Sequence, residues 1–535
     1  MKTSMISRTW RGTIAIAMAL TAASSIMGAV PTIAASKTGD NVDITINKKD
    51  GLHLNGPHQN TGVAMPDLDN QEPVAEVGFT VYDVSQYFYD NYDGENAGDL
   101  YKDLTNNWDK LYAANATSIS EAKTQQETDK EGKTTFTGLP TKVDYKINAE
   151  GDTRVRNAVY VIVETKLAGD MTPSLPMVVA MPVYMPKENE KDPDVVNKNI
   201  QLYPKNYGVD KVLLEGNEPV DESKSYDFEV GKVLTYQVKF AIPEDIGHTK
   251  VKDGTSLYDS FLVYDAMSKV GATFKGITSM EIAGENVLNT LGEGAPGVTF
   301  KSTLDEADKA ASWSLDYNIK DAAMREVLAN YAGKTMTVKY QVMINENAKP
   351  DEMINNIFKV DFDRDGTDIK QKDDGPNVTT GGAQFIKVNS TDLKKPLEGA
   401  VFKVKNAAGK YAKFIGAGGW KAPSSIEWKD TEAEGTEITT EKDGKIVLQG
   451  LEYNEGDEQY VLVEITPPTG FVSPVNPNTP FTVTEGSYSI DKLLYVKNTP
   501  ETDGKLPLTG GIGLITLVVV GGALMGASAL KKKED

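Results

Sequence analysis

The chain has 535 residues, no cysteine and a formal net charge of −21. The negative charge argues against binding to nucleic acid, and against binding to anionic lipid through a basic surface, because both need clustered positive charge. Three histidines and no cysteine leave little for a histidine-based catalytic site or a zinc site.

The chain opens with a segment typical of exported proteins. Basic residues between positions 2 and 11 precede an apolar, alanine-rich stretch that ends near Val30, and small residues follow. This pattern predicts a secretory signal peptide over residues 1–35, cleaved near Ala34 or Ala35. An exported chain without cysteine cannot use disulfides, so any covalent crosslink within its domains needs other chemistry.

Residues 36–206 have the pattern of a first β-sandwich domain. Apolar and polar residues alternate from Val42 to Ile46, which predicts a half-buried strand. Residues 97–114 favour helix within a polar insertion. The domain ends in Tyr203-Pro204-Lys205-Asn206. Because Pro204 cannot donate to a sheet, we expect a strand end there and a reachable Lys205 side chain.

The residue pattern over 207–380 predicts a second β-rich domain. Alternation in Tyr236–Ile242 and in Val338–Ile344 indicates strands with one face in the core of a sandwich. Residues 321–331 form the best candidate for a short helix. Gly292–Gly297 matches a dinucleotide-binding fingerprint in its letters, but no buried strand leads into it, so we expect a loop there.

An acidic stretch near the end of the second domain could hold an ion. Asp361, Asp363 and Asp365 place oxygens at alternate positions, and Gly366 follows at a turn, as in a calcium loop. No glutamate stands at the twelfth position, so a solvated acidic turn is the alternative. Calcium is the one candidate ion, and no cofactor is required.

Residues 381–500 predict a third domain. Short strand-like runs open it at Phe385–Val388, recur at Tyr460–Ile465 and close it at Leu494–Asn498, with turn-rich segments between them. Evenly spaced strands of this kind indicate an immunoglobulin-like sandwich. The predicted fold class is therefore all-β, with tandem immunoglobulin-like β-sandwich domains.

Two charged residues of the third domain fall on apolar strand faces. Glu464 shares a face with Tyr460, and Lys387 shares one with Phe385. A buried ion pair is one interpretation. Desolvation also lowers the pKa of a lysine and raises that of a glutamate, so a neutral Lys387 amine could attack the amide of Asn498 while Glu464 shuttles protons. The product would be an amide crosslink between the first and last strands.

The C-terminal residues 501–535 contain an apolar run and a basic end. About 20 uncharged residues precede Lys531-Lys532-Lys533, enough for a helix that spans a membrane with the lysines on the cytoplasmic side. A plain membrane anchor is one interpretation. Immediately before the run stand Leu506, Pro507, Leu508, Thr509 and Gly510.

This pentapeptide, followed by a span and a basic tail, resembles the cell-wall sorting signal that sortases of Gram-positive bacteria cut. The resemblance implies cleavage between Thr509 and Gly510 and transfer of the threonine carbonyl to an amine. The apolar tail would hold the chain in the membrane only until then. The segment Tyr203–Asn206 resembles the pilin motif of pilus shaft subunits, whose lysine, here Lys205, supplies that amine.

The third domain also resembles a known domain type. Lys387, the segment from Glu464 to Phe471, and Asn498 match the collagen-adhesin B-type domain, which forms an intramolecular isopeptide bond. In that resemblance, Glu464 is the acid that promotes the bond.

The second domain resembles the related A-type domain, in which an aspartate replaces the glutamate. The corresponding residues are Lys211, Asp265 and Asn356, with Asp259 and Asn355 as alternatives. The first domain offers Glu164 and either Lys48 or Lys49. It shows no obvious closing asparagine, so we expect no bond there.

As a whole, the chain resembles the sortase-assembled pilus shaft subunits of Gram-positive bacteria, in particular the major fimbrial subunits of Actinomyces. This implies a structural subunit of a cell-wall fimbria, in which Lys205 of one copy joins Thr509 of the next. The implied partners are sortase, identical subunits, peptidoglycan directly or through a base subunit, a tip adhesin, and host or bacterial surface receptors. A monomeric wall-anchored adhesin is the alternative. An enzyme is disfavoured because the chain lacks a Gly-x-Ser-x-Gly nucleophile elbow.

Overall fold

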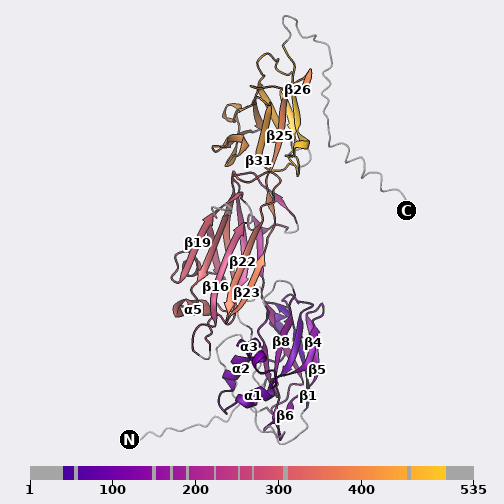
Figure 1. The fold of residues 1–535 in the computed structure, drawn as a ribbon, viewed down its shortest axis with the longest axis vertical. Coiled ribbons are helices and arrows are strands. Elements are labelled where there is room, and N and C mark those ends of the chain that lie inside the picture. The colour runs from indigo at the N-terminus through magenta and orange to yellow at the C-terminus, as the bar shows by residue number, and fades with distance from the viewer. Residues whose placement is uncertain are drawn as a thin grey trace, which may run out of the picture.

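A computed structural model describes residues 40–501 except 53–57, 59, 148–151, 169–172, 188–191, 222–223, 251–252, 268–269, 305–310 and 455–458. The predicted signal peptide, the sorting motif Leu506–Gly510 and the predicted span lie outside these residues. Among the described residues, no helix has both the length and the apolar character that a membrane crossing needs. Three strand-rich domains follow one another along an elongated molecule (Figure 1).

The first domain packs two sheets face to face, with strand orders β10-β1-β5 and β4-β3-β8-β9. Alternation along β1 places Val42, Ile44 and Ile46 in the core at 0–1 % exposure, as the sequence predicts. Two small sheets, β11-β2 and β6-β7, complete the domain. Its strands are β1 (Asn41–Asn47), β2 (Lys49–Asp50), β3 (Gly78–Asp83), β4 (Ser120–Glu127), β5 (Lys133–Pro140), β6 (Lys142–Lys146), β7 (Thr153–Asn157), β8 (Val159–Lys166), β9 (Met177–Ala180), β10 (Asn199–Leu202) and β11 (Lys205–Asn206), with a 3₁₀ turn, η1, at Pro66–Leu68.

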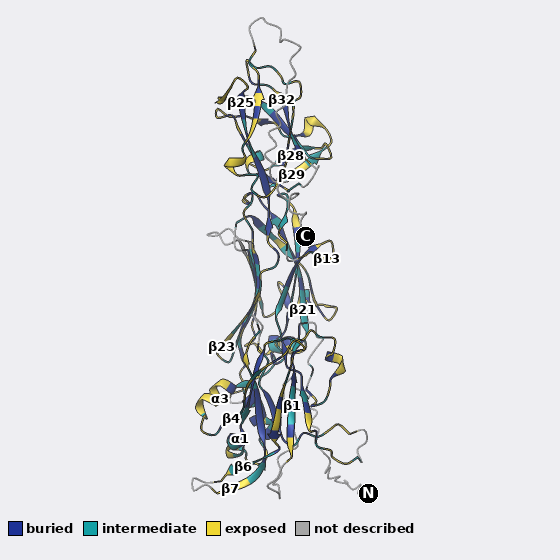
Figure 2. Ribbon diagram, turned by 90° about the vertical axis from the view of Figure 1, so that its right-hand side faces the viewer, coloured by how far each residue is buried: buried dark blue, intermediate teal, exposed yellow. Residues whose placement is uncertain are grey.

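A helical insertion between β3 and β4 covers the outer face of the four-stranded sheet. It comprises α1 (Ser85–Asn91), α2 (Ala97–Asn106) and α3 (Trp108–Ala114), which confirms the predicted helix over 97–114. Leu100 and Leu104 of α2 pack with Val161 of β8. The first half of β8, Val159–Ile162, is therefore buried on both faces, which explains why this part of the strand is apolar throughout. The outward faces of these helices are exposed (Figure 2).

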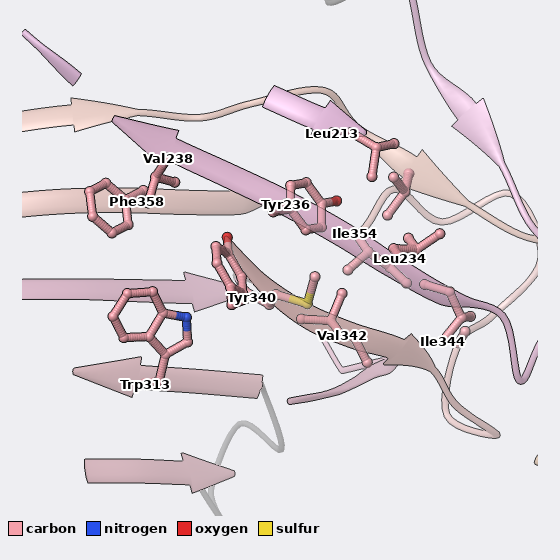
Figure 3. Packing of buried hydrophobic residues seen from close by; sticks show 14 of the residues in the cluster. Leu213, Leu234, Tyr236, Val238, Trp313, Tyr340, Val342, Ile344, Ile354 and Phe358 are labelled. Atoms are coloured by element: carbon pink, nitrogen blue, oxygen red, sulfur yellow. The ribbon is translucent and has the colours of Figure 1, made fainter. Parts of the chain in front are cut away.

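The middle domain is a sandwich of a six-stranded sheet, β13-β12-β15-β21-β17-β18, and a five-stranded sheet, β19-β20-β16-β22-β23. Between them lies an aromatic core in which Tyr236, Trp313 and Tyr340 gather (Figure 3). Its strands are β12 (Val209–Glu215), β13 (Glu218–Pro219), β14 (Tyr226–Asp227), β15 (Val233–Ala241), β16 (Tyr258–Met267), β17 (Ala272–Ile282), β18 (Glu285–Asn286), β19 (Val298–Leu304), β20 (Ala311–Tyr317), β21 (Thr335–Ile344), β22 (Asn356–Arg364), β23 (Thr367–Asp373) and β24 (Val378–Thr379).

Two short helices belong to the middle domain, α4 (Leu288–Leu291) and α5 (Ala322–Ala329). The helix predicted over 321–331 is confirmed. It begins where predicted because the carboxylate of Asp321 accepts a hydrogen bond from the Ala323 amide at 2.8 Å and so caps the first turn.

The third domain places its first strand, β25, beside its last, β34, in parallel register, with Lys387 opposite Val496 and Asn389 opposite Asn498. Its two sheets have the orders β26-β25-β31, with β34 on β25, and β29-β28-β27-β32-β33, with β30 on β27. The elements are β25 (Gly381–Asn389), β26 (Asp392–Pro396), β27 (Val401–Lys405), β28 (Tyr411–Ile415), β29 (Ser425–Lys429), β30 (Ile438–Thr439), β31 (Lys445–Leu451), β32 (Tyr460–Thr466), β33 (Asn478–Phe481) and β34 (Leu494–Asn498), with 3₁₀ turns at Gly419–Lys421, Glu432–Glu434 and Ile490–Lys492.

Candidate crosslinking and linkage sites

The structure brings together the three residues predicted to react in the third domain. Lys387 Nζ donates to Glu464 Oε2 at 2.7 Å and makes a short hydrogen bond to Asn498 Oδ1. Asn498 Nδ2 donates to Glu464 Oε1 at 2.6 Å. All three residues are at most 7 % exposed. Because β25 and β34 are neighbours, amine and amide meet directly, and β32 presents the acid from the opposite sheet.

The first domain contains the same arrangement, and the expectation that it lacks a closing asparagine is wrong. Lys48 Nζ donates to Glu164 Oε2 at 2.8 Å and makes a short hydrogen bond to Asn206 Oδ1, while Asn206 Nδ2 donates to Glu164 Oε1 at 2.8 Å. Asn206 is the residue directly after Lys205. Its strand β11 has only two residues and pairs in parallel with β2, so no local pattern marks it as a closing strand.

The lysines of the first and third domains sit in matching backbone settings. Lys48 and Lys387 each donate their amide to a glycine carbonyl at 2.7 Å, from Gly132 and Gly444 respectively. Both glycines have left-handed φ values of 71° and 69°, and a Cβ at either would lie 2.5 Å from the carbonyl oxygen of its lysine. Only glycine fits there without strain. The recurrence of this construction supports an equivalent role for the two lysines.

In the middle domain, the structure brings together Lys211, Asp265 and Asn356. Lys211 Nζ donates to Asp265 Oδ2 and to the backbone oxygen of Asn356, both at 2.7 Å. The alternatives lie elsewhere. Asp259 is partly exposed and contacts Lys250 at 3.4 Å, and Asn355 is exposed.

Sequence reasoning missed one participant in the middle domain. The hydroxyl of Tyr340 donates to Asp265 Oδ2 at 2.5 Å and accepts from Asn356 Nδ2 at 3.1 Å. In the sequence, Tyr340 is one of several apolar residues that alternate along a strand, and nothing local separates it from a core residue.

Burial shifts the pKa values of the three lysines and of Asp265 in the direction that favours their neutral forms. It lowers the pKa of Lys48 and of Lys387, and it lowers that of Lys211 to about 8, although each amine has a carboxylate beside it. Burial also raises the pKa of Asp265. When the pKa values of an amine and its neighbouring acid approach each other, the neutral amine and the protonated acid become accessible together. A neutral amine is the form that can attack an amide.

Lys205 is buried, contrary to the expectation that its side chain is reachable. Its side chain is 7 % exposed, and its Nζ donates to the carbonyl of His58 at 2.6 Å and lies 4.0 Å from Glu244 Oε1. Glu244 belongs to the middle domain and also accepts a short hydrogen bond from Tyr207. The middle domain covers the strand end, a contact that local sequence does not reveal. Lys205 forms part of the wall of a cavity of about 220 Å³ between the two domains.

The acidic turn between β22 and β23 takes part in the same domain contact. Asp365 accepts from Lys110 of α3 at 2.6 Å and pairs with Lys250 at 3.0 Å, and Arg364 donates to the carbonyl of Asn106 at 3.0 Å. Asp361 and Asp363 lie within β22. Across the parts of the chain that the structure describes, no group of three acidic, histidine or cysteine residues could hold a metal ion. Asp365 therefore contacts two lysines, and calcium binding at this turn stays a prediction.

Comparison with known proteins agrees with this architecture. Residues 39–207 match the family model of the Gram-positive pilin subunit D1, N-terminal domain, and residues 381–494 match that of a prealbumin-like fold domain. The type 1 fimbrial subunit of Actinomyces viscosus is 24 % identical over 97 % of this chain and 96 % of its own length. The type 2 fimbrial subunit of Actinomyces naeslundii is 22 % identical over 90 % and 87 %.

Among solved structures, the full-length major pilin SpaD from Corynebacterium diphtheriae aligns with 86 % of this chain and 98 % of its own, at 18 % identity and a TM-score of 0.48. The full-length major pilin RrgB from Streptococcus pneumoniae aligns with 86 % and 100 %, at 15 % identity and a TM-score of 0.43. The pilin N-terminal domain, together with fimbrial relatives that align along nearly the whole sequence, places this chain among the pilus shaft subunits of Gram-positive bacteria.

Proposed function

We propose that this major pilin is polymerised covalently, by a sortase that joins Lys205 of one subunit to Thr509 of the next. Lys205 stands at the end of the first domain, and Thr509 follows the third. A link between these two points adds each subunit to a different surface of its neighbour. Such a heterologous contact does not close on itself and generates a filament.

We further propose that each domain carries an intramolecular amide bond, namely Lys48–Asn206, Lys211–Asn356 and Lys387–Asn498. The observation that supports this most strongly is the burial of three lysine–acid–asparagine sets, with the acids Glu164, Asp265 and Glu464. Attack of each amine on its asparagine carbonyl releases ammonia. The reaction is autocatalytic and turns over once, so the protein is not an enzyme in the ordinary sense.

The proposed bonds would shorten the path that carries tension along a fibre. Force that enters at Lys205 would run a few residues to Lys211, cross to Asn356, continue to Lys387 and cross to Asn498. The strands between the crosslinked positions would then bear no load. The first domain precedes Lys205 in the chain and would carry no tension. Its Lys48–Asn206 bond would instead hold in place the strand that contains Lys205.

The proposed setting is the cell surface. The predicted signal peptide exports the chain, and the C-terminal segment retains it until sortase acts. The finished fibre would be anchored to peptidoglycan directly or through a base subunit, would carry a tip adhesin, and would support adhesion to host or bacterial receptors. The fimbrial names of its relatives support this setting.

One observation favours the alternative of a monomeric wall-anchored adhesin: Lys205 is almost fully covered. Wall extracts run on a denaturing gel separate the two functions. A ladder of high-mass species that disappears in Lys205→Ala supports the polymer. A single wall-released band in the wild type rejects it.

A further inference from the structure

The crosslinking sites differ in how the acid reaches the asparagine. In the first and third domains a glutamate spans the site, since one carboxylate oxygen accepts from the lysine and the other from the asparagine amide. In the middle domain the acid is Asp265, which is shorter by one methylene group. The amide of Asn356 donates instead to the Tyr340 hydroxyl.

Tyr340 therefore occupies the place between acid and leaving group. Its hydroxyl donates to the same oxygen, Asp265 Oδ2, that accepts from Lys211 Nζ, and it accepts from Asn356 Nδ2, the nitrogen that would depart. The hydrogen bonds thus form a continuous chain from the attacking amine to the leaving nitrogen.

The surrounding core holds this hydroxyl in place. Tyr340 pairs across β15 and β21 with Tyr236, and the two rings stack with centroids 5.7 Å apart (Figure 3). Trp313 packs against the Tyr340 ring edge-on at 5.3 Å. All three side chains are at most 2 % exposed. A buried hydroxyl fixed by packing and by two hydrogen bonds is organised before the reaction begins.

We propose that Tyr340 is a catalytic residue of the middle-domain crosslink, relaying a proton from Asp265 to the departing nitrogen of Asn356. The reaction starts from neutral Lys211 and protonated Asp265. As Lys211 Nζ bonds to Asn356 Cγ, both hydrogen bonds of the Tyr340 hydroxyl reverse their resting direction: Asp265 gives its proton to the Tyr340 oxygen, and the phenolic proton passes to Nδ2. The Cγ–Nδ2 bond breaks, ammonia leaves, and the surplus proton on Nζ returns to Asp265. One amide forms, one molecule of ammonia is lost, and both Asp265 and Tyr340 are regenerated.

This inference rests on the proposed crosslinks, and the other two domains provide an internal control on the same chain. A chain recovered from inclusion bodies in denaturant, before it has ever folded, starts without crosslinks, and dilution starts the reaction. Intact mass then falls by about 17 Da per bond. Peptide mapping assigns each step to its domain. We expect Tyr340→Phe to slow the Lys211–Asn356 bond by about 100-fold, the usual scale of general acid–base assistance, while the other two bonds form at wild-type rates.

The matched control is Tyr317→Phe, which removes another buried hydroxyl of this domain, bonded to the Leu291 carbonyl at 3.1 Å and remote from the crosslink. It should leave the middle-domain rate unchanged. A wild-type rate in Tyr340→Phe would overturn the proposal, as would equal slowing in Tyr317→Phe. If no bond forms in any domain of the wild type, the proposed function fails instead.

A second variant covers the case in which Tyr340→Phe does not fold. A fluorinated tyrosine at position 340 keeps the ring and the hydroxyl but makes the hydroxyl more acidic. The middle-domain rate should then change while the other two stay constant. An unchanged rate at this position would refute the relay.

Discussion

The first-domain crosslink yields the sharpest prediction for stability, through Asn206→Ala. This change removes the amide that reacts but leaves the ion pair of Lys48 and Glu164 in place at 2.8 Å. The bond would close a loop between positions 158 residues apart. By analogy with a disulfide, closing a loop of that size stabilises the fold by roughly 5 kcal/mol.

For a domain of this size, 1 kcal/mol shifts the melting temperature by about 2–4 °C, so Asn206→Ala should lower the first-domain transition by roughly 10–20 °C. Calorimetry measures the shift, and intact mass should rise by about 17 Da after correction for the substitution. The control is Asn197→Ala, another buried asparagine of the domain, whose Nδ2 donates to the Gly62 carbonyl at 2.6 Å. Its loss should cost about 1–3 kcal/mol. A wild-type mass without the deficit, or equal shifts in both variants, would show that Asn206 forms no stabilising crosslink.

Three further predictions concern the other sites. The rate of middle-domain crosslinking should be bell-shaped in pH, because Lys211 and Asp265 must share one proton. Below the raised pKa of Asp265 the pair gains a second proton, and above about pH 8 it loses the last one. A rate that keeps rising past pH 9, measured in time courses quenched at intervals, would contradict this. Gly444→Ala should destabilise the third domain by about 1–3 kcal/mol in denaturant titrations, because φ is left-handed there and a Cβ would meet a backbone oxygen at 2.5 Å; an unchanged midpoint would count against that geometry. Arg364→Ala should speed amine-reagent labelling of Lys205 several-fold by loosening the domain contact, whereas labelling at the wild-type rate would show that this contact does not control access.

The third-domain site was predictable because its residues lie in ordinary strands. Alternation places Lys387 and Glu464 on apolar faces, and burial of opposite charges on such faces calls for a partner. Asn498 closes the last strand, and the sandwich puts first and last strands side by side. The overall all-β architecture follows from the same alternation. Helix α5 was predictable from a local signal, because Asp321 caps its first turn.

What could not be predicted depends on contacts between distant segments. Asn206 closes the first-domain site from a two-residue strand, and Tyr340 reaches Asp265 only because two sheets meet. Lys205 is covered by the middle domain rather than by its own neighbours. One sequence signal does link the two sites: a lysine, an acidic residue, a glycine and a lysine recur at 130–133 and at 442–445, where Gly132 and Gly444 accept hydrogen bonds from the amides of Lys48 and Lys387.

Mass spectrometry of the purified fibre can detect the covalent link between subunits itself. Digestion of the fibre should yield a branched peptide in which the Lys205 amine is joined to the Thr509 carbonyl, with one water lost. Recovery of Lys205 only as an unmodified residue, with Thr509 joined only to peptidoglycan, would rule out a polymer linked through Lys205.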